Sequence, residues 1–156
     1  MINDPNFTLD LGPRWLTQAT ADPQQYRFTD EARDITMTLS SGAHRLDPDA
    51  VAPFAADLAR RRVAAESEAA GAAGRTILIY EPIVVPQRWG ESIAYYGHDS
   101  SGRRFSFAGT VTATTLIGLY MESGRLTEGA LARAMDTVLS HIDFDQTPIR
   151  PRIPYS

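Results

Sequence analysis

The chain has 156 residues, of which 43% are hydrophobic and 22% charged, the length and composition of a single folded domain. Its formal net charge of −4 argues against a nucleic-acid partner, which would require a basic face. The lack of cysteine excludes disulfides, thiolate catalysis and cysteine-bound zinc. No basic region followed by an apolar stretch begins the sequence, and no run approaches the roughly 20 apolar residues of a membrane span. We therefore expect a cytoplasmic protein with no membrane partner.

The first third of the chain predicts three short strands. Apolar and polar residues alternate from Phe7 to Leu11, the period-2 pattern of a half-buried strand. Residues 26–29 and 35–40 alternate in the same way on either side of a polar turn at residues 30–33. The sequence therefore predicts a strand followed by a hairpin.

A long helix is expected next. Asp47 is placed to cap it, and Pro48 suits the first helical position. Gly71 and Gly74 are expected to end it. Between these signals apolar residues recur at helical spacing: Val51, Phe54, Ala55, Leu58 and Val63. The run of arginines at residues 60–62 resembles a basic patch, but we interpret it as a solvated helix face because acidic residues lie one or two turns away.

Residues 75–123 contain four apolar runs separated by turn signals, and we expect the sheet to be organised around them. Strict alternation along residues 77–85 places two sets of side chains on opposite faces. One set is Ile77, Ile79, Ile83 and Val85, interrupted by Glu81; the other is Leu78, Tyr80, Pro82 and Val84. Three further strands follow, over residues 93–96, 105–111 and 116–121.

The last predicted helix begins at Thr127, which can cap it, with Leu126 and Leu131 spaced as a hydrophobic staple. Its apolar stripe consists of Leu131, Met135, Val138, Leu139 and Ile142. We predict one α+β domain over residues 1–144, an antiparallel meander sheet of about six to seven strands with two main helices. Residues 145–156 contain three prolines and no periodicity, so we expect an extended C-terminal tail.

The order of these elements resembles the PsbP-like fold as found in bacterial DcrB-like proteins. The resemblance rests on the segment FTLDLGPRW, the long strand TILIYEPIVV, an aromatic-rich meander and a final helix ending in HIDF, and it covers roughly residues 7 to 144. It implies a non-enzymatic binding module, because members of the group include adaptor chaperones for type VI secretion effectors, immunity-type proteins and small lipoproteins. The chain has no lipidation cysteine, and its first helix lacks a glutamine-rich amphipathic pattern. The resemblance therefore favours the immunity type over the chaperone.

Few residues suggest catalysis or metal binding. The three histidines stand far apart without a second ligand nearby, so structural or surface roles are expected for them: His44, His98 and His141. Asp143 and Asp145 could share a face around a divalent ion, but a solvated helix exit is the simpler interpretation. Glu81 is either a buried acid paired with an arginine such as Arg104 or a residue at the sheet edge, and we favour the edge. We expect no enzyme, no metal and no cofactor.

Aromatic residues offer a better indication of a binding site. If both helices pack on the Phe105 and Phe107 side, the opposite face exposes the following residues: Tyr80, Val84, Tyr96 and Ala108. Such a face would bind a protein partner or form a homodimer, and tyrosine and tryptophan are favoured anchors in such contacts. The partner-binding candidates are Tyr80, Trp89, Glu91, Tyr96 and Asp99. Glu91 and Asp99 would form an acidic rim that steers a basic toxin surface.

Three functions remain open. The first is an immunity-type protein that neutralises a cognate toxin or effector by binding and occlusion, and a charged, convex surface would favour it. The alternative is an adaptor chaperone, which predicts a continuous exposed apolar groove. The third is a ligand-binding or enzymatic domain, which predicts a closed pocket with convergent polar groups. We rank it last because no such cluster is visible in the sequence.

Overall fold

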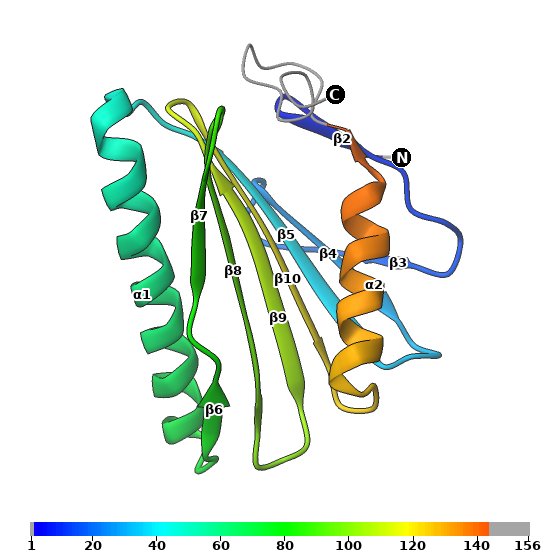
Figure 1. Cartoon of the computed structure of the whole chain (residues 1–156). Coiled ribbons are helices and arrows are strands. Elements are labelled where there is room, and N and C mark those ends of the chain that lie inside the picture. Colours follow the sequence, from blue (N-terminus) through cyan, green and yellow to red (C-terminus); the bar gives the residue numbers. More distant parts are fainter. Residues whose placement is uncertain (1, 144–156) are drawn as a thin grey trace.

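Residues 2–143, the part of the chain that the computed structural model describes, form eleven strands and two helices (Figure 1). In chain order they are β1 (Ile2–Asp4), β2 (Phe7–Leu9), β3 (Leu16–Gln18), β4 (Gln25–Asp30), β5 (Ile35–Ala43), α1 (Pro48–Ala72), β6 (Ile77–Ile79), β7 (Ile83–Gln87), β8 (Gly90–Asp99), β9 (Arg104–Val111), β10 (Thr115–Ser123), α2 (Glu128–Ser140) and β11 (Ile142–Asp143). The predicted tail over residues 145–156 lies outside the described residues. Neither helix is long and apolar enough to cross a membrane.

Eight of the strands form one antiparallel sheet in the order β3-β4-β5-β10-β9-β8-β6, with β7 also paired to β8. Its centre is the pairing of β5 with β10, in which Leu39 lies opposite Leu119. The other strands form a small sheet in the order β1-β2-β11. The predicted α+β class is confirmed, but the strand that begins at Phe7 belongs to this small sheet and not to the main one.

The two helices lie on opposite sides of the main sheet (Figure 1). One core lies beneath α1 and includes Val51, Ala55, Tyr95, Phe105 and Phe107. The other lies beneath α2 and the small sheet and includes Phe7, Met37, Leu119, Leu131 and Val138. The assumption that both helices pack on the Phe105 and Phe107 side was therefore wrong. An apolar stripe shows that a helix buries one face, but it does not show which side of the sheet receives it.

The helix ends follow the local signals. Thr127 Oγ1 accepts a hydrogen bond from Ala130 N at 3.2 Å, as expected of a cap. Asp47 occupies the N-cap position of α1 with extended backbone, but its side chain makes no cap hydrogen bond. After Ala72 the chain turns at Gly74, whose φ of 71° favours glycine. Gly71 is still helical, so the second of the two predicted stop signals ends the helix.

The edge of the main sheet contains a bulge between β6 and β7. Ile79 lies opposite Gly97 and Ile83 lies opposite Ala94, so residues 80–82 face only residues 95–96 of β8. One extra residue in a strand reverses the alternation of the side chains that follow it. Val84 therefore points toward α1, where it packs half-buried against the core, and its predicted position on the opposite face was wrong.

Candidate functional site

On the α2 side of the sheet, the helix covers the part formed by β9 and β10 and leaves β6, β7 and most of β8 uncovered (Figure 1). Five of the six large apolar side chains that are exposed within residues 2–143 gather there. We call this set the apolar face; its members, with their exposed fractions, are Leu78 (49%), Tyr80 (38%), Ile83 (58%), Val85 (41%) and Tyr96 (42%). Large apolar side chains exposed side by side usually mark a binding surface.

The bulge between β6 and β7 assembles the apolar face. In regular alternation, Leu78 and Tyr80 would lie on the opposite side from Ile83 and Val85. The extra residue brings both pairs to the side of Ala94 and Tyr96, as the register with β8 shows. The sequence therefore pointed to Tyr80 and Tyr96 and placed Leu78 on the face of Tyr80, but it assigned Ile83 and Val85 to the opposite face, because the bulge has no clear signal in the sequence.

Two aromatic rings give the apolar face a fixed shape. Tyr80 and Tyr96 stack with ring centroids 4.5 Å apart and an interplanar angle of 28°. Tyr80 also approaches the His98 ring, at 6.4 Å between centroids. Rings held in this way lose little conformational entropy when a partner binds, which makes them suitable anchors.

The apolar face continues into a groove beside α2. A hollow of about 350 Å³ lies between Ile83 and Val85 of β7 and Leu139 of α2, with Trp89, Ala94 and Ala108 also in its wall. A second hollow of about 450 Å³ lies at the other end of α2, between Tyr96 and Gly129. Trp89 is half-buried, so it forms part of the groove wall and is not a freely exposed turn residue. We call the two hollows together with the apolar face the trough along α2.

The two acidic candidates do not form a rim around this surface. Glu91 is half-buried and belongs to the set of β8 residues, with Ile93 and Tyr95, that points toward α1. Asp99 is only 4% exposed. The prediction that Asp99 steers a partner was therefore wrong, because its carboxylate is held inside the protein.

Asp99 is the acceptor of a dense set of charged and polar contacts. Arg75 Nε and Arg103 Nε lie 2.9 and 3.0 Å from Asp99 Oδ2, and Ser101 donates to Oδ1 from its backbone N at 2.9 Å and from Oγ at 2.5 Å. Burial alone would raise the pKa of Asp99, but the hydrogen bonds from Ser101 and Arg103 outweigh it and lower the pKa to about 2. The cluster ties the β8–β9 loop to the end of α1.

Arg103 extends this cluster to Tyr120 and the first helix. Its Nη1 donates to Tyr120 Oη at 2.9 Å and to the Glu122 carboxylate. Tyr120 Oη in turn donates to the Glu66 carboxylate at 3.1 Å. Burial, followed by the nearby Glu66, raises the pKa of Tyr120, and burial also raises the pKa of Glu66. Tyr120 therefore stays protonated at neutral pH, and these groups join α1 to the sheet.

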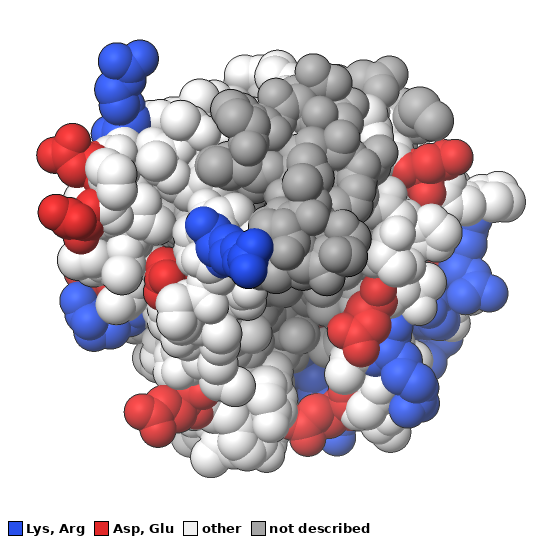
Figure 2. Space-filling model, turned by 45° about the horizontal axis from the view of Figure 1, so that its top comes forward, with Lys and Arg blue, Asp and Glu red and all other residues white. Residues whose placement is uncertain are grey.

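The remaining candidates have structural or surface positions. His44 Nε2 is 2.8 Å from the Thr112 carbonyl oxygen, and Glu81 is exposed at the sheet edge, as we favoured. Arg104 donates to the Leu126 carbonyl at 3.2 Å. Among the side chains of residues 2–142 no three metal-binding groups come together, and the predicted Asp143–Asp145 pair lies outside the described side chains. Acidic and basic side chains are interspersed over the face drawn in Figure 2, with neither sign dominating it.

Comparisons with known proteins identify the fold. No family model matches the chain, and no curated protein matches its sequence. Among solved structures, the cyanobacterial PsbP protein CyanoP of Synechocystis sp. PCC 6803 superposes with a TM-score of 0.66 at 14% identity, over 90% of this chain and 87% of that chain. A Bacteroides thetaiotaomicron protein matches at a TM-score of 0.49 and 8% identity, over 92% of this chain and 47% of that one.

The chain therefore has a PsbP-like α+β fold. At 14% identity the likeness to CyanoP shows the fold alone, and one fold serves many functions. The function has to be argued from the surfaces of this chain.

Proposed function

We propose that the protein is a non-enzymatic protein-binding module of the adaptor-chaperone kind, which accommodates an apolar segment of a partner protein on the apolar face. The observation that supports this is the concentration of exposed large apolar side chains on one part of one side of the sheet. A type VI secretion effector is the class of partner that the DcrB-like resemblance suggests.

The shape of the surface favours this role over the immunity type. A chaperone requires a continuous exposed apolar groove, and the five exposed apolar side chains beside two hollows along α2 support that role. An immunity-type protein was expected to present an acidic rim, but Asp99 is buried in ion pairs and Glu91 belongs to the α1 side. Neutralisation of a toxin by occlusion therefore ranks second.

The partner segment that would bind in the trough is an amphipathic helix. Strand addition at this edge is disfavoured, because the bulge and Pro86 interrupt the row of backbone donors along β6 and β7. The run from Leu78 to Val85 extends over about 20–25 Å at roughly 3.3 Å per residue. A helix of about 13–16 residues has that length. It would lie beside α2 and cover β6–β8 as α1 does on the other side.

Site-specific photocrosslinking in the native host tests this proposal. p-Benzoylphenylalanine replaces Tyr96 on the apolar face or, as a matched control, Arg27, which is exposed on the other side of the sheet. We expect an adduct at position 96 alone, with crosslinks that map to an amphipathic helical stretch of one partner, and its loss in an Ile83→Glu background. Equal adducts at both positions would contradict the proposal. An adduct only between two copies of this chain would also contradict it, and would assign the apolar face to a homodimer.

A further inference from the structure

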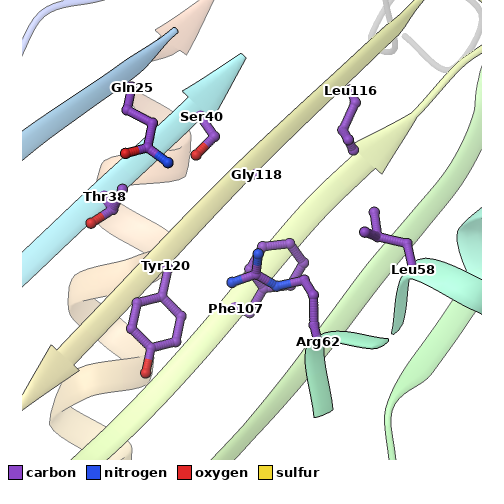
Figure 3. A pocket seen from close by; sticks show the side chains of 9 residues that line it. All are labelled: Gln25, Thr38, Ser40, Leu58, Arg62, Phe107, Leu116, Gly118 and Tyr120. Carbon is purple, nitrogen blue, oxygen red and sulfur yellow. The ribbon is translucent and has the colours of Figure 1, made fainter. Parts of the chain in front are cut away.

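A third hollow lies on the other side of the sheet, between α1 and the strands β4, β5 and β10 (Figure 3). Helix α1 packs over β6–β8 and leaves the adjoining strands of the sheet uncovered. A pocket of about 220 Å³ forms where the helix ends its cover of the sheet, beside Leu58 and Arg62. Residues from five elements line it (β4, β5, α1, β9 and β10), so the pocket is formed by the fold as a whole and not by a local loop.

Arg62 is the only arginine of the helical run 60–62 that points into this pocket. Its guanidinium carbon lies 3.9 Å from the Phe107 ring centroid, and its Nε is buried with no hydrogen-bond partner among the described residues. Arg60 and Arg61, by contrast, are exposed and pair with Asp57. The interpretation of all three arginines as a solvated helix face was therefore wrong for Arg62. Its guanidinium stacks on Phe107 and interacts electrostatically with Glu66 and Tyr95, and in the pocket it can donate hydrogen bonds to a planar anion.

The wall opposite Arg62 carries neutral polar groups. Gln25, Thr38 and Ser40 point into the pocket from β4 and β5 (Figure 3), and their side chains make no hydrogen bond with residues 2–143. Tyr120 also lines the pocket, but its hydroxyl hydrogen is engaged by Glu66. The hydrogen-bonding groups that the pocket offers a ligand are thus the Arg62 guanidinium, two hydroxyls and one amide.

Two leucines and a glycine complete the pocket. Leu58 of α1 and Leu116 of β10 form an apolar rim on the side away from Tyr120 (Figure 3). Gly118 lies on the floor, where an added Cβ would come within 3.0 Å of the Phe107 ring. The lack of a side chain at position 118 therefore lets Phe107 keep its position under Arg62 and leaves the space at the bottom of the pocket unfilled.

From this arrangement we propose that the pocket binds a small organic monocarboxylate with a short apolar tail. Arg62 would receive the carboxylate together with the Thr38 and Ser40 hydroxyls, and Leu58 and Leu116 would contact the tail. Arg62 is the one cationic side chain that lines the pocket, and Glu66, one helical turn along α1, partly offsets its charge, which favours a monoanion over phosphate. Its volume is below the roughly 300–1,000 Å³ of pockets for drug-sized ligands, so the acid is small.

This site is independent of the proposed protein-binding role, because it lies on the opposite side of the sheet. Protein NMR tests it with isobutyrate and benzoate as probes, their uncharged amides as matched controls, and inorganic phosphate. We expect a carboxylate to cause saturable shifts of the Arg62 Nε–H signal and of the backbone amides of Thr38, Ser40 and Gly118. The uncharged amides should cause none.

Variants make the assignment specific. Arg62→Gln should weaken carboxylate binding by about tenfold or more, the effect of losing a charged hydrogen-bond donor, whereas Arg60→Gln should leave it unchanged. Should Arg62→Gln fail to fold, Thr38→Val keeps the shape of the side chain and should weaken binding severalfold. Three results would overturn the site: no saturable shift with either acid, an equal response to the amides, or unchanged affinity in a folded Arg62→Gln variant. Binding of phosphate in preference to both acids would overturn the ligand class.

Discussion

Tyr80 and Tyr96 stack face to face at 4.5 Å on the uncovered part of the sheet, while 38% and 42% of their surfaces remain exposed. The pair joins the bulge between β6 and β7 to the middle of β8, so it holds the apolar face at its centre. Exposed tyrosines that already pack on each other present a rigid surface to a partner.

Substitutions on the apolar face should affect partner binding far more than stability. Ile83→Glu removes exposed apolar surface and should change the free energy of unfolding by no more than about 0.5 kcal/mol, whereas Tyr96→Ser also breaks the stack with Tyr80 and should cost about 1 kcal/mol. Loss of a central aromatic anchor should weaken partner binding by about 2 kcal/mol, roughly thirtyfold. Urea unfolding and calorimetry on the same samples measure both quantities. A large loss of stability in both variants would show that these residues belong to the fold and not to an interface.

Removal of the buried carboxylate should destabilise the protein. Asp99→Asn removes the negative charge that Arg75 and Arg103 share and replaces one acceptor oxygen by an amide donor, and we expect a loss of about 2–4 kcal/mol in the free energy of unfolding. Asp57→Asn is the matched control, because it breaks only the exposed pairs with Arg60 and Arg61 and should cost less than about 1 kcal/mol. Equal effects of the two substitutions would contradict the role assigned to the Asp99 cluster.

The same carboxylate predicts an acid dependence. The pKa of Asp99 in the folded protein is about 2, below its ordinary value of 3.8. Protons therefore bind the unfolded chain first as the pH falls, and the stabilisation present above about pH 4 is lost between about pH 4 and pH 2. Unfolding free energies of the wild type and Asp99→Asn across this range should converge as the pH falls. Parallel curves would show that Asp99 does not titrate in the way its contacts imply.

A glycine supports the pairing of β6 with β8. A Cβ added at Gly97 would lie 2.3 Å from the Leu78 carbonyl oxygen and 2.8 Å from the Phe105 ring, so the backbone of β6 would have to move. We expect Gly97→Ala to lower the free energy of unfolding by about 1–3 kcal/mol, as overpacking does. Gly12→Ala has no neighbour within 4 Å of the new Cβ and should be nearly neutral. Thermal unfolding of the two variants checks this, and a neutral Gly97→Ala would contradict the described register at this edge.

The two helix starts should respond differently to alanine. Thr127→Ala removes the side-chain acceptor for Ala130 N and should cost about 1 kcal/mol. Asp47→Ala removes a side chain that makes no cap hydrogen bond, so its effect should be smaller. Chemical unfolding ranks the two, and the reverse order would show that the charge of Asp47 at the helix terminus outweighs the Thr127 cap.

Much of the fold could be predicted from residues whose local signals are uninterrupted. Ile35, Met37 and Leu39 alternate without a break, and the structure buries all three. Thr127 marks the start of α2 correctly. The DcrB-like part of the resemblance and the type VI secretion role remain proposals, whereas the PsbP-like fold is confirmed by the likeness to CyanoP.

What could not be predicted depends on contacts between distant segments. Strict alternation through Glu81 and Pro82 placed Val84 on the wrong side, because a bulge is defined by the partner strand and not by its own sequence. Arg62 looks like Arg60 and Arg61 in sequence, yet about 100° of helical rotation per residue turns it toward Phe107. Asp99 was wrongly predicted to bind a partner for a similar reason, since Arg75 and Arg103 come next to its carboxylate only in the folded chain.

The most direct test of the protein-binding role is calorimetry with the partner segment that crosslinks at position 96, prepared as a peptide of about 16 residues. We predict saturable binding to the wild type, loss of binding to Ile83→Glu, and unchanged affinity for Arg27→Glu, which alters the other side of the sheet. If Ile83→Glu binds as tightly as the wild type while Arg27→Glu does not, the apolar face is not the docking surface and the account is wrong.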